Sequence, residues 1–247
     1  MNFLLPWIPF LALGLVVEVL VRTEIVPSYL LPATSDVLVS LVRDHKELLG
    51  GLESTTIAAV LGLLLSLTLG LFAAVVLSLS ERLRHAFLPY AVFFQTVPII
   101  ALAPVLVIWF GFGRPTVMAS AFIVSVFPMI ANSIAGLLSP DPMLLDLFRL
   151  HKASRFQTLW KLRLPTAMPS IFTGLKIAAG LAVIGAVVGE FVAGGGLGEV
   201  VDAARTQQRL DKVFAAVLLS SFLGLALVGL IDLVSKLFLR SWMRVPK

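Results

Sequence analysis

The hydrophobic residues of this chain fall into six long runs separated by short polar segments. The second, third and fourth runs contain no charged residue. A helix needs about 20 apolar residues to cross a bilayer, and none of the runs alternates apolar and polar residues as a barrel strand does. The pattern predicts an all-α polytopic membrane protein in which residues 1–247 form a single transmembrane domain. Its six transmembrane helices are expected at about residues 4–21, 55–79, 86–110, 116–138, 170–192 and 213–239.

Composition supports lipid as the surrounding medium. Charged residues make up 13% of the chain and hydrophobic residues 59%, whereas a soluble domain carries about 25% charged residues. The first run lacks a basic leader and a small-residue cleavage site, so we interpret it as a retained span. The absence of cysteine excludes disulfides, thiolate nucleophiles and cysteine metal sites.

The positive charges indicate how the chain is oriented. The net charge is +5, but the basic residues flank the apolar runs, which fits membrane topology better than nucleic-acid binding. Lys176 lies within a run; of the other lysines and arginines, eleven fall on one side and seven on the other. Because basic loops stay in the cytoplasm, both termini are expected there, with the protein in the cell (inner) membrane. The richer side holds Arg82, Arg84, Arg149, Lys152, Arg155, Lys161, Arg163, Lys236, Arg240, Arg244 and Lys247; the other holds Arg22, Arg43, Lys46, Arg114, Arg205, Arg209 and Lys212.

Residues 140–165, between the fourth and fifth runs, are too polar to cross the membrane and too patterned for a plain linker. Asp141 and Pro142 suit a helix start, and Ser154 suits the cap of a second short helix. Pro165 is expected to end that helix, because the residue before proline avoids helical geometry. On composition alone, two interpretations stay open: a basic loop lying on anionic lipid, or a helical element that docks into a groove of a partner protein.

The same segment resembles the cytoplasmic EAA loop of ABC importer permeases. When that pattern is anchored on Leu164 and Pro165, its glycine falls on Lys152 and its glutamate on Asp146. Glycine permits a turn with positive φ, whereas lysine adopts one only with strain, so the turn is expected to be wider or differently capped. Residues 153–157, Ala-Ser-Arg-Phe-Gln, resemble the nitrate/sulfonate/taurine branch. The resemblance implies ATPase docking through Asp146, Arg149, Lys152, Ala153, Ser154, Arg155, Phe156, Trp160, Leu162, Leu164 and Pro165.

The resemblance covers roughly residues 30–245, through segments 31–37, 94–98, 101–104, 109–113 and 195–198 and through Phe127-Pro128, Asn132 and Gly136. It implies a permease subunit of an ATP-driven importer that is not itself an enzyme and binds no cofactor. A separate ATPase subunit would use the ATP, because the chain has no Walker A sequence. The expected partners are a second copy of the chain, two ATPase subunits, an extracytoplasmic solute-binding protein and membrane lipid. Nitrate, sulfonates, taurine and pyrimidine vitamin precursors are the implied solutes.

Polar residues and prolines within the runs are candidates for the translocation path: Gln95, Pro98, Asn132 and Glu190. An ionisable residue inside a membrane is by default a functional hypothesis. For Glu190 three roles stay open: lining the path, organising the turn that follows, or a purely structural carboxylate. Pro98 removes a backbone donor and predicts a kink, which serves either the path or packing.

Other residues in the runs favour structural roles. We expect Lys176 to snorkel toward the interface and Asp232 to pair with Lys236 at i, i+4. Gly62 and Gly70 are expected to allow close helix approach.

Two other classes of function compete. An ion-driven secondary transporter would show charged coupling residues near the middle of the bilayer, and these are almost absent. An intramembrane enzyme would need a catalytic constellation within the spans, but all three histidines lie outside them and form no metal-binding spacing. No catalytic or metal-ligating residue is therefore predicted.

Overall fold

The computed structural model describes residues 7–242, in which every regular element is helical. This confirms the predicted all-α polytopic fold. The elements are α1 (Trp7–Arg22), α2 (Thr34–Arg43), α3 (His45–Leu79), α4 (Glu81–Thr96), α5 (Ile99–Phe110), α6 (Arg114–Leu137), α7 (Pro142–Leu150), α8 (Arg155–Thr158), the π-helical turn η1 (Leu159–Arg163), α9 (Leu164–Ala193), α10 (Leu197–Thr206) and α11 (Leu210–Trp242).

Four helical stretches in residues 7–242 are long and apolar enough to cross a membrane singly: His45–Leu79, Arg114–Leu137, Arg155–Ala193 and Leu210–Arg240. They correspond to the second, fourth, fifth and sixth predicted spans. The first predicted span begins in residues 4–6, which lie outside the described residues, and its described part is the 16-residue helix α1.

The third predicted span is divided into two helices at Pro98, the proline that was predicted to kink it. Residues 86–110 form two helices, α4 and α5, which are separated at Val97 and Pro98. Pro98 has φ −61° and ψ 119° at the start of α5. Its ring fixes φ and removes a backbone donor, and the extended ψ then turns the chain out of the α4 direction.

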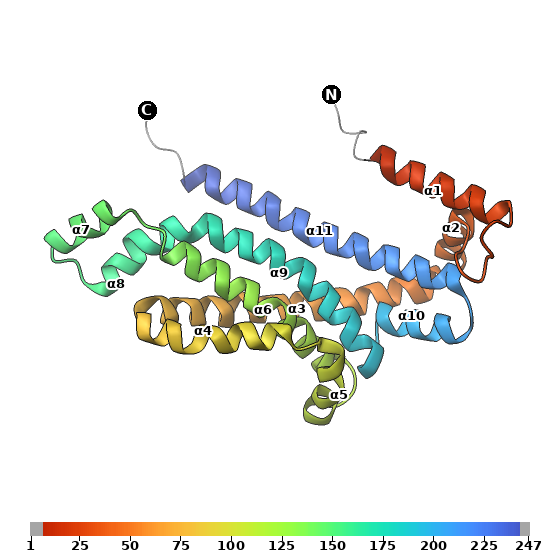
Figure 1. Cartoon of the computed structure of the whole chain (residues 1–247), viewed down its shortest axis with the longest axis horizontal. Coiled ribbons are helices and arrows are strands. Elements are labelled where there is room, and N and C mark those ends of the chain that lie inside the picture. Colours follow the sequence, from red (N-terminus) through yellow and green to blue (C-terminus); the bar gives the residue numbers. More distant parts are fainter. Residues whose placement is uncertain (1–6, 243–247) are drawn as a thin grey trace.

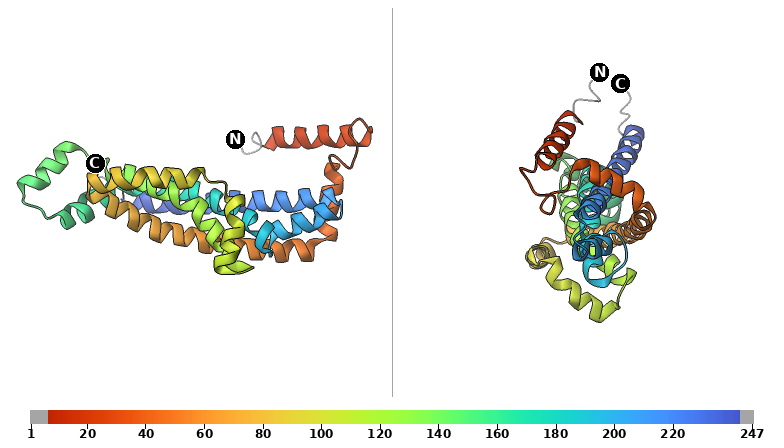
Figure 2. Two further views of the ribbon diagram at one scale, coloured as in Figure 1. Left: turned by 60° about the horizontal axis from the view of Figure 1, so that its bottom comes forward. Right: turned by 90° about the vertical axis from the view of Figure 1, so that its right-hand side faces the viewer.

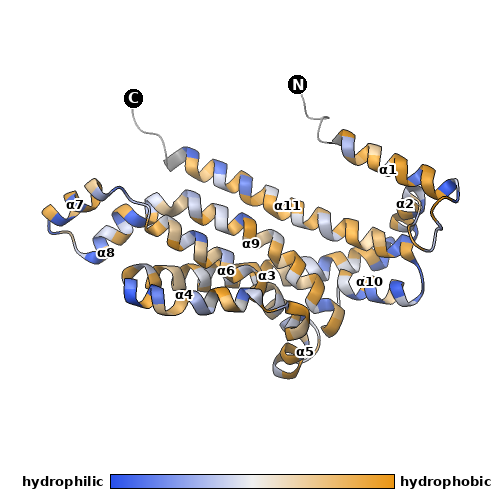
Figure 3. Cartoon of the chain, viewed as in Figure 1, coloured by the Kyte–Doolittle hydropathy of each residue, from blue (hydrophilic) through white to orange (hydrophobic). Residues whose placement is uncertain are grey.

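The helices form an elongated bundle with a distinct element at each end (Figure 1). Helix α9 packs against α6 and α11, and α3 packs against α6. The short helices α7 and α8 project from one end, which we call the coupling end; α2 and α10 lie at the other, the far end. Helix α1 stands apart from the bundle and contacts α2 (Figure 2). Colouring by hydropathy places the polar residues mainly at these two ends (Figure 3).

Small residues bring the central helices into close contact. A Cβ at Gly62 of α3 would lie 2.6 Å from the Cβ of Ala121 in α6, so a larger residue cannot enter without displacing α6. The buried Ser66 and Ser125 hydroxyls hydrogen-bond across the same interface. Association through small residues and hydroxyl contacts is typical of helices in lipid, and it confirms the predicted role of Gly62.

Candidate functional site

The projecting segment at the coupling end is a helix, a tight turn and a second helix. Asp141 caps α7, because its Oδ1 accepts a hydrogen bond from the Met143 amide at 2.8 Å. Ser154 and Gln157 form a capping box at the start of α8: the Ser154 amide donates to Gln157 Oε1 at 2.9 Å, and the Gln157 amide donates to Ser154 Oγ at 3.2 Å. Both helix starts are therefore fixed by local sequence, as predicted for Asp141 and Ser154.

The turn between α7 and α8 was predicted to be wider or differently capped, because lysine replaces glycine there, but it is a tight turn. Lys152 has φ +53°, the left-handed geometry that glycine would adopt at this position. The Ala153 amide donates to the Phe148 carbonyl and the Lys152 amide to the Arg149 carbonyl, both at 2.9 Å. These two bonds define a Schellman motif, so the tight turn survives without glycine. The turn costs conformational energy, because Lys152 carries a Cβ and is strained in the left-handed geometry.

Pro165 does not end the second helix, which corrects a further prediction. Helix α8 continues through η1 into α9, and Leu164 keeps helical geometry with φ −62° and ψ −48°. The Leu164 amide donates to the Leu159 carbonyl, five residues earlier, as in a π-helix. A wider turn at this point accommodates the proline ring and its missing donor without breaking the helix.

The segment has one face toward solvent and one toward the bundle. Phe156 is 69% exposed and Trp160 is 58% exposed, and their ring centroids lie 5.9 Å apart. Leu159 and Leu162, by contrast, are buried, and Leu159 packs in a cluster with residues of α3, α6 and α9. The predicted docking residue Leu162 therefore anchors the segment to the bundle, whereas the two aromatic side chains are available to a partner.

Three arginines line a pocket of about 400 Å³ beneath this segment: Arg149, Arg155 and Arg163. Arg163 Nη1 donates to the Ser78 carbonyl at the end of α3, at 3.1 Å. Arg149 pairs with Asp146 at 2.9 Å. Asp146, predicted to take the place of the EAA glutamate, thus has a partner within its own helix.

Of the four candidate path residues, Gln95 and Pro98 lie close to the α4–α5 break and are exposed. Gln95 lines a cavity of about 340 Å³ with the apolar side chains of α5 and α6, including Trp109 and Phe127. Asn132 lies elsewhere, at the α6–α9 contact, where its Nδ2 donates to the Pro128 carbonyl at 2.9 Å. The structure therefore does not bring the four residues together into one site.

Glu190 lies in the protein interior, 1% exposed, and lines no open path in this structure. Its Oε2 accepts hydrogen bonds from the Gly198 amide at 2.8 Å and from Thr55 Oγ1 at 3.0 Å. Thr55 Oγ1 also accepts from the Leu197 amide at 2.9 Å. A carboxylate at the α10 N-terminus satisfies free amides and opposes the positive end of the helix dipole. Of the roles left open, this geometry supports organising the turn after α9.

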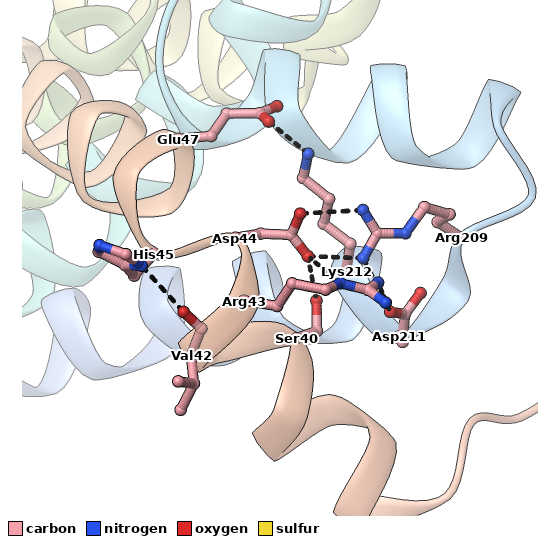
Figure 4. A network of polar contacts seen from close by, with 9 residues as sticks. All are labelled: Ser40, Val42, Arg43, Asp44, His45, Glu47, Arg209, Asp211 and Lys212. Atoms are coloured by element: carbon pink, nitrogen blue, oxygen red, sulfur yellow. Dashed lines mark hydrogen bonds and ion pairs between the residues drawn. The ribbon is translucent and has the colours of Figure 1, made fainter.

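A second polar network at the far end was not predicted (Figure 4). Arg209, between α10 and α11, donates to both oxygens of Asp44, between α2 and α3, at 3.0 and 2.5 Å. Arg209 and Arg43 also donate to Asp211 Oδ2, at 2.9 and 3.0 Å. Hydrogen bonds from Arg209 hold the pKa of the Asp44 carboxyl well below its usual range, and bonding to Asp44 raises the pKa of Arg209. The network ties the two helix junctions together.

Asp44 and Arg209 are 165 residues apart, so local spacing could not reveal this pair. The available signal was the presence of opposite charges at the same ends of two predicted spans: Asp44 and Glu47 before the second, Arg209 and Lys212 before the sixth. The orientation of the chain was inferred from lysines and arginines alone, so their acidic partners were not considered.

Comparison with known proteins places the chain in a family. Residues 66–240 match the family described as binding-protein-dependent transport system inner membrane component. A probable ABC transporter permease protein of Haemophilus influenzae is 37% identical over 208 residues, which cover 83% of this chain and 84% of the relative.

Two further relatives carry names that state a solute. The formylaminopyrimidine transport permease protein ThiX of Halalkalibacterium halodurans is 35% identical, over 89% of this chain and 88% of its own length. The putative aliphatic sulfonates transport permease protein SsuC of Bacillus subtilis is 30% identical, over 72% of this chain and 65% of its own length.

A solved structure shares the fold. A chain of the MetNI methionine ABC transporter, in an inward-facing conformation, matches with a TM-score of 0.69 and 18% identity, over 80% of this chain and 96% of that one. The relatives support an ATP-driven importer over the ion-driven alternative. The chain therefore belongs to the binding-protein-dependent inner membrane components, as an ABC importer permease subunit of the nitrate/sulfonate/taurine branch.

Proposed function

We propose that two copies of this chain form the membrane-spanning half of an importer, with one ATPase subunit docked on the α7–α8 segment of each copy. The family description implies a solute-binding protein, which we place at the far end of the bundle. One docking segment per chain suits a two-fold symmetric pair that presents two equivalent surfaces to two ATPases.

The exposed aromatic pair, Phe156 on α8 and Trp160 on η1, is the observation that carries this proposal. Phe156 and Trp160 are four residues apart and share one helix face, with Leu159 and Leu162 buried on the other. Large apolar side chains at helical spacing on a projecting element suit insertion into a groove of a partner protein. The opposite, buried face would transmit a displacement of α8 to the bundle.

The arrangement of charges supports a cytoplasmic coupling end. The predicted inner side carries eleven lysines and arginines against seven on the other side. Helix α1 runs toward the far end and α11 runs back toward the coupling end (Figure 1). Both termini would then be cytoplasmic, and the Asp44–Arg209 network would face outward.

We place the transported solute among pyrimidine vitamin precursors. This class is supported by the 35% identity to the formylaminopyrimidine permease over 89% of the chain. The cavity beside Gln95 suits it, because Trp109 and Phe127 offer flat apolar surfaces and the Gln95 amide offers a donor and an acceptor. Uptake of labelled formylaminopyrimidine into vesicles that contain the permease, its ATPase and its binding protein tests this assignment. Faster uptake of taurine or an alkanesulfonate would instead assign the transported solute to that class.

Recruitment of the ATPase tests the docking assignment. Phe156→Asp and Trp160→Asp should abolish co-purification of the ATPase, while the permease still inserts and keeps its melting temperature. Phe112, which is 76% exposed between α5 and α6, provides the matched control, because Phe112→Asp places the same charge on an exposed aromatic outside the segment. If the Phe156 and Trp160 variants both retain the ATPase as the control does, the segment formed by α8 and η1 is not the docking element.

A further inference from the structure

The inner part of the α9–α11 seam carries an ion cluster outside the docking segment. Asp232 of α11 is shared by two lysines: Lys176 of α9 pairs with Oδ1, and Lys236 of α11 lies 2.6 Å from Oδ2. Lys176 was expected to snorkel toward the interface, and the sequence did not indicate its pairing with a residue 56 positions away. The predicted pairing of Asp232 with Lys236 is confirmed.

This cluster lies at one edge of a cavity of about 730 Å³ that Arg240 also lines. Among the residues that the structure describes, three cations and one carboxylate line the cavity, which leaves an excess of two positive charges. The Lys236 side chain is 72% exposed. A lysine ammonium has three donors, and Lys236 spends one on Asp232, so it can still bind an anion.

Apart from Ser235, the rest of the cavity wall is made of leucines. Leu233 and Leu237 are 55% and 61% exposed and line the cavity beside the cations. Leu233 and Leu237 are four residues apart, as are Lys236 and Arg240, so each pair follows one side of the helix. At a rise of about 1.5 Å per residue, Arg240 lies about 12 Å closer to the coupling end than Asp232. Leu233 and Leu237 each lie three residues, about 4.5 Å, deeper than Lys236 and Arg240 respectively, so the apolar and cationic sides match the two parts of a phospholipid.

We infer that this cavity binds an anionic phospholipid, with its phosphate between Lys236 and Arg240 and an acyl chain along Leu233 and Leu237. Charge complementarity requires the anionic headgroup, since two positive charges are unbalanced. The leucine wall favours a lipid over a soluble anion, which gains nothing from apolar contact. Basic pockets between membrane helices bind acidic headgroups in this manner. The inference does not depend on the transported solute or on ATPase docking.

The melting temperature of the purified full-length chain in detergent tests the inference, because a ligand that binds the folded state raises it. Dioleoylphosphatidylglycerol should raise it by several degrees, whereas dioleoylphosphatidylcholine and inorganic phosphate should not. The double variant Lys236→Gln/Arg240→Gln should lose this increment. The matched control Arg114→Gln/Arg205→Gln removes the same charge outside the cavity and should keep the increment.

A second variant tests the apolar wall of the cavity without altering its charge. Leu237→Trp fills the cavity from an exposed position and should also lose the phosphatidylglycerol increment. An unchanged increment in either variant overturns the inference, as does an equal effect of inorganic phosphate on the wild type. Light scattering of the double variant tests the remaining alternative. If copies of the chain dissociate while phosphatidylglycerol still raises the melting temperature, the surface is an interface between copies and the inference is likewise overturned.

Discussion

Lys152 is a position at which one substitution should stabilise the coupling segment. It has φ +53° at the end of α7, and two hydrogen bonds close the turn around it. A left-handed backbone costs a residue with a Cβ about 1–2 kcal/mol, whereas glycine adopts it freely. Glycine in turn loses about 0.5–1 kcal/mol more conformational entropy on ordering. The difference predicts that Lys152→Gly stabilises the turn by about 0.5–1 kcal/mol.

Amide hydrogen exchange of the Ala153 amide measures this effect, because that amide bonds to the Phe148 carbonyl across the turn. A gain of about 0.5–1 kcal/mol corresponds to exchange that is about 2- to 5-fold slower after correction for intrinsic rates. Lys152→Ala is the control for lost charge, since alanine keeps the Cβ and should leave exchange unchanged. His151→Gly is the control for glycine entropy, because His151 has φ −78° and gains no relief.

Two outcomes would refute this reasoning. Equal slowing in Lys152→Ala would assign the effect to charge rather than to backbone geometry. Unchanged or faster exchange in Lys152→Gly would show that the left-handed turn is not strained. Either result would leave no physical reason for the glycine of the family pattern at this position.

Three further predictions concern other parts of the chain. Ser154→Ala removes the α8 cap and should destabilise the segment by about 1 kcal/mol, seen as faster exchange in α8 with the spans unaffected. Gly62→Leu should lower the melting temperature through about 1–3 kcal/mol of overpacking, whereas Gly50→Leu, in the same helix with open space around it, should not. The Asp44 carboxyl has a pKa below its unfolded value of about 3.9, so its stabilising effect is present above about pH 4 and lost as pH falls further. The melting curves of wild type and Asp44→Asn should therefore differ at pH 6 and converge below pH 4; a constant difference would contradict the linkage.

The spans could be predicted because lipid allows few structures. A backbone that crosses hydrocarbon must satisfy its own hydrogen bonds, so long apolar runs become helices. The same argument is weak where proline occurs. Pro98 breaks its span, whereas Pro165 follows the widened turn η1 and Pro104 and Pro128 lie inside unbroken helices.

The polar contacts of the site could not be predicted in the same way. Capping boxes and helix starts are local, so Asp141 and Ser154 were found from short spacings. The ion pairs of Asp44 with Arg209 and of Lys176 with Asp232 join residues 165 and 56 positions apart. Such pairs form only when particular helices become neighbours. The spacing of residues along one sequence does not show which helices these are.

The structure also indicates where movement can occur when the coupling segment is displaced. Residues 155–193 form one continuous helix, about 58 Å long at 1.5 Å per residue, from the exposed aromatic pair to the turn beside Glu190. Its middle packs closely against α6 and α11 and cannot bend without losing those contacts. Its two ends differ: η1 is a widened turn, and Gly194–Gly196 all have positive φ. A displacement of α8 should therefore be taken up at η1 or at the glycine turn, where Glu190 fixes α10 and the Asp44–Arg209 network fixes the next junction. The helix between them would transmit the movement as a rigid element.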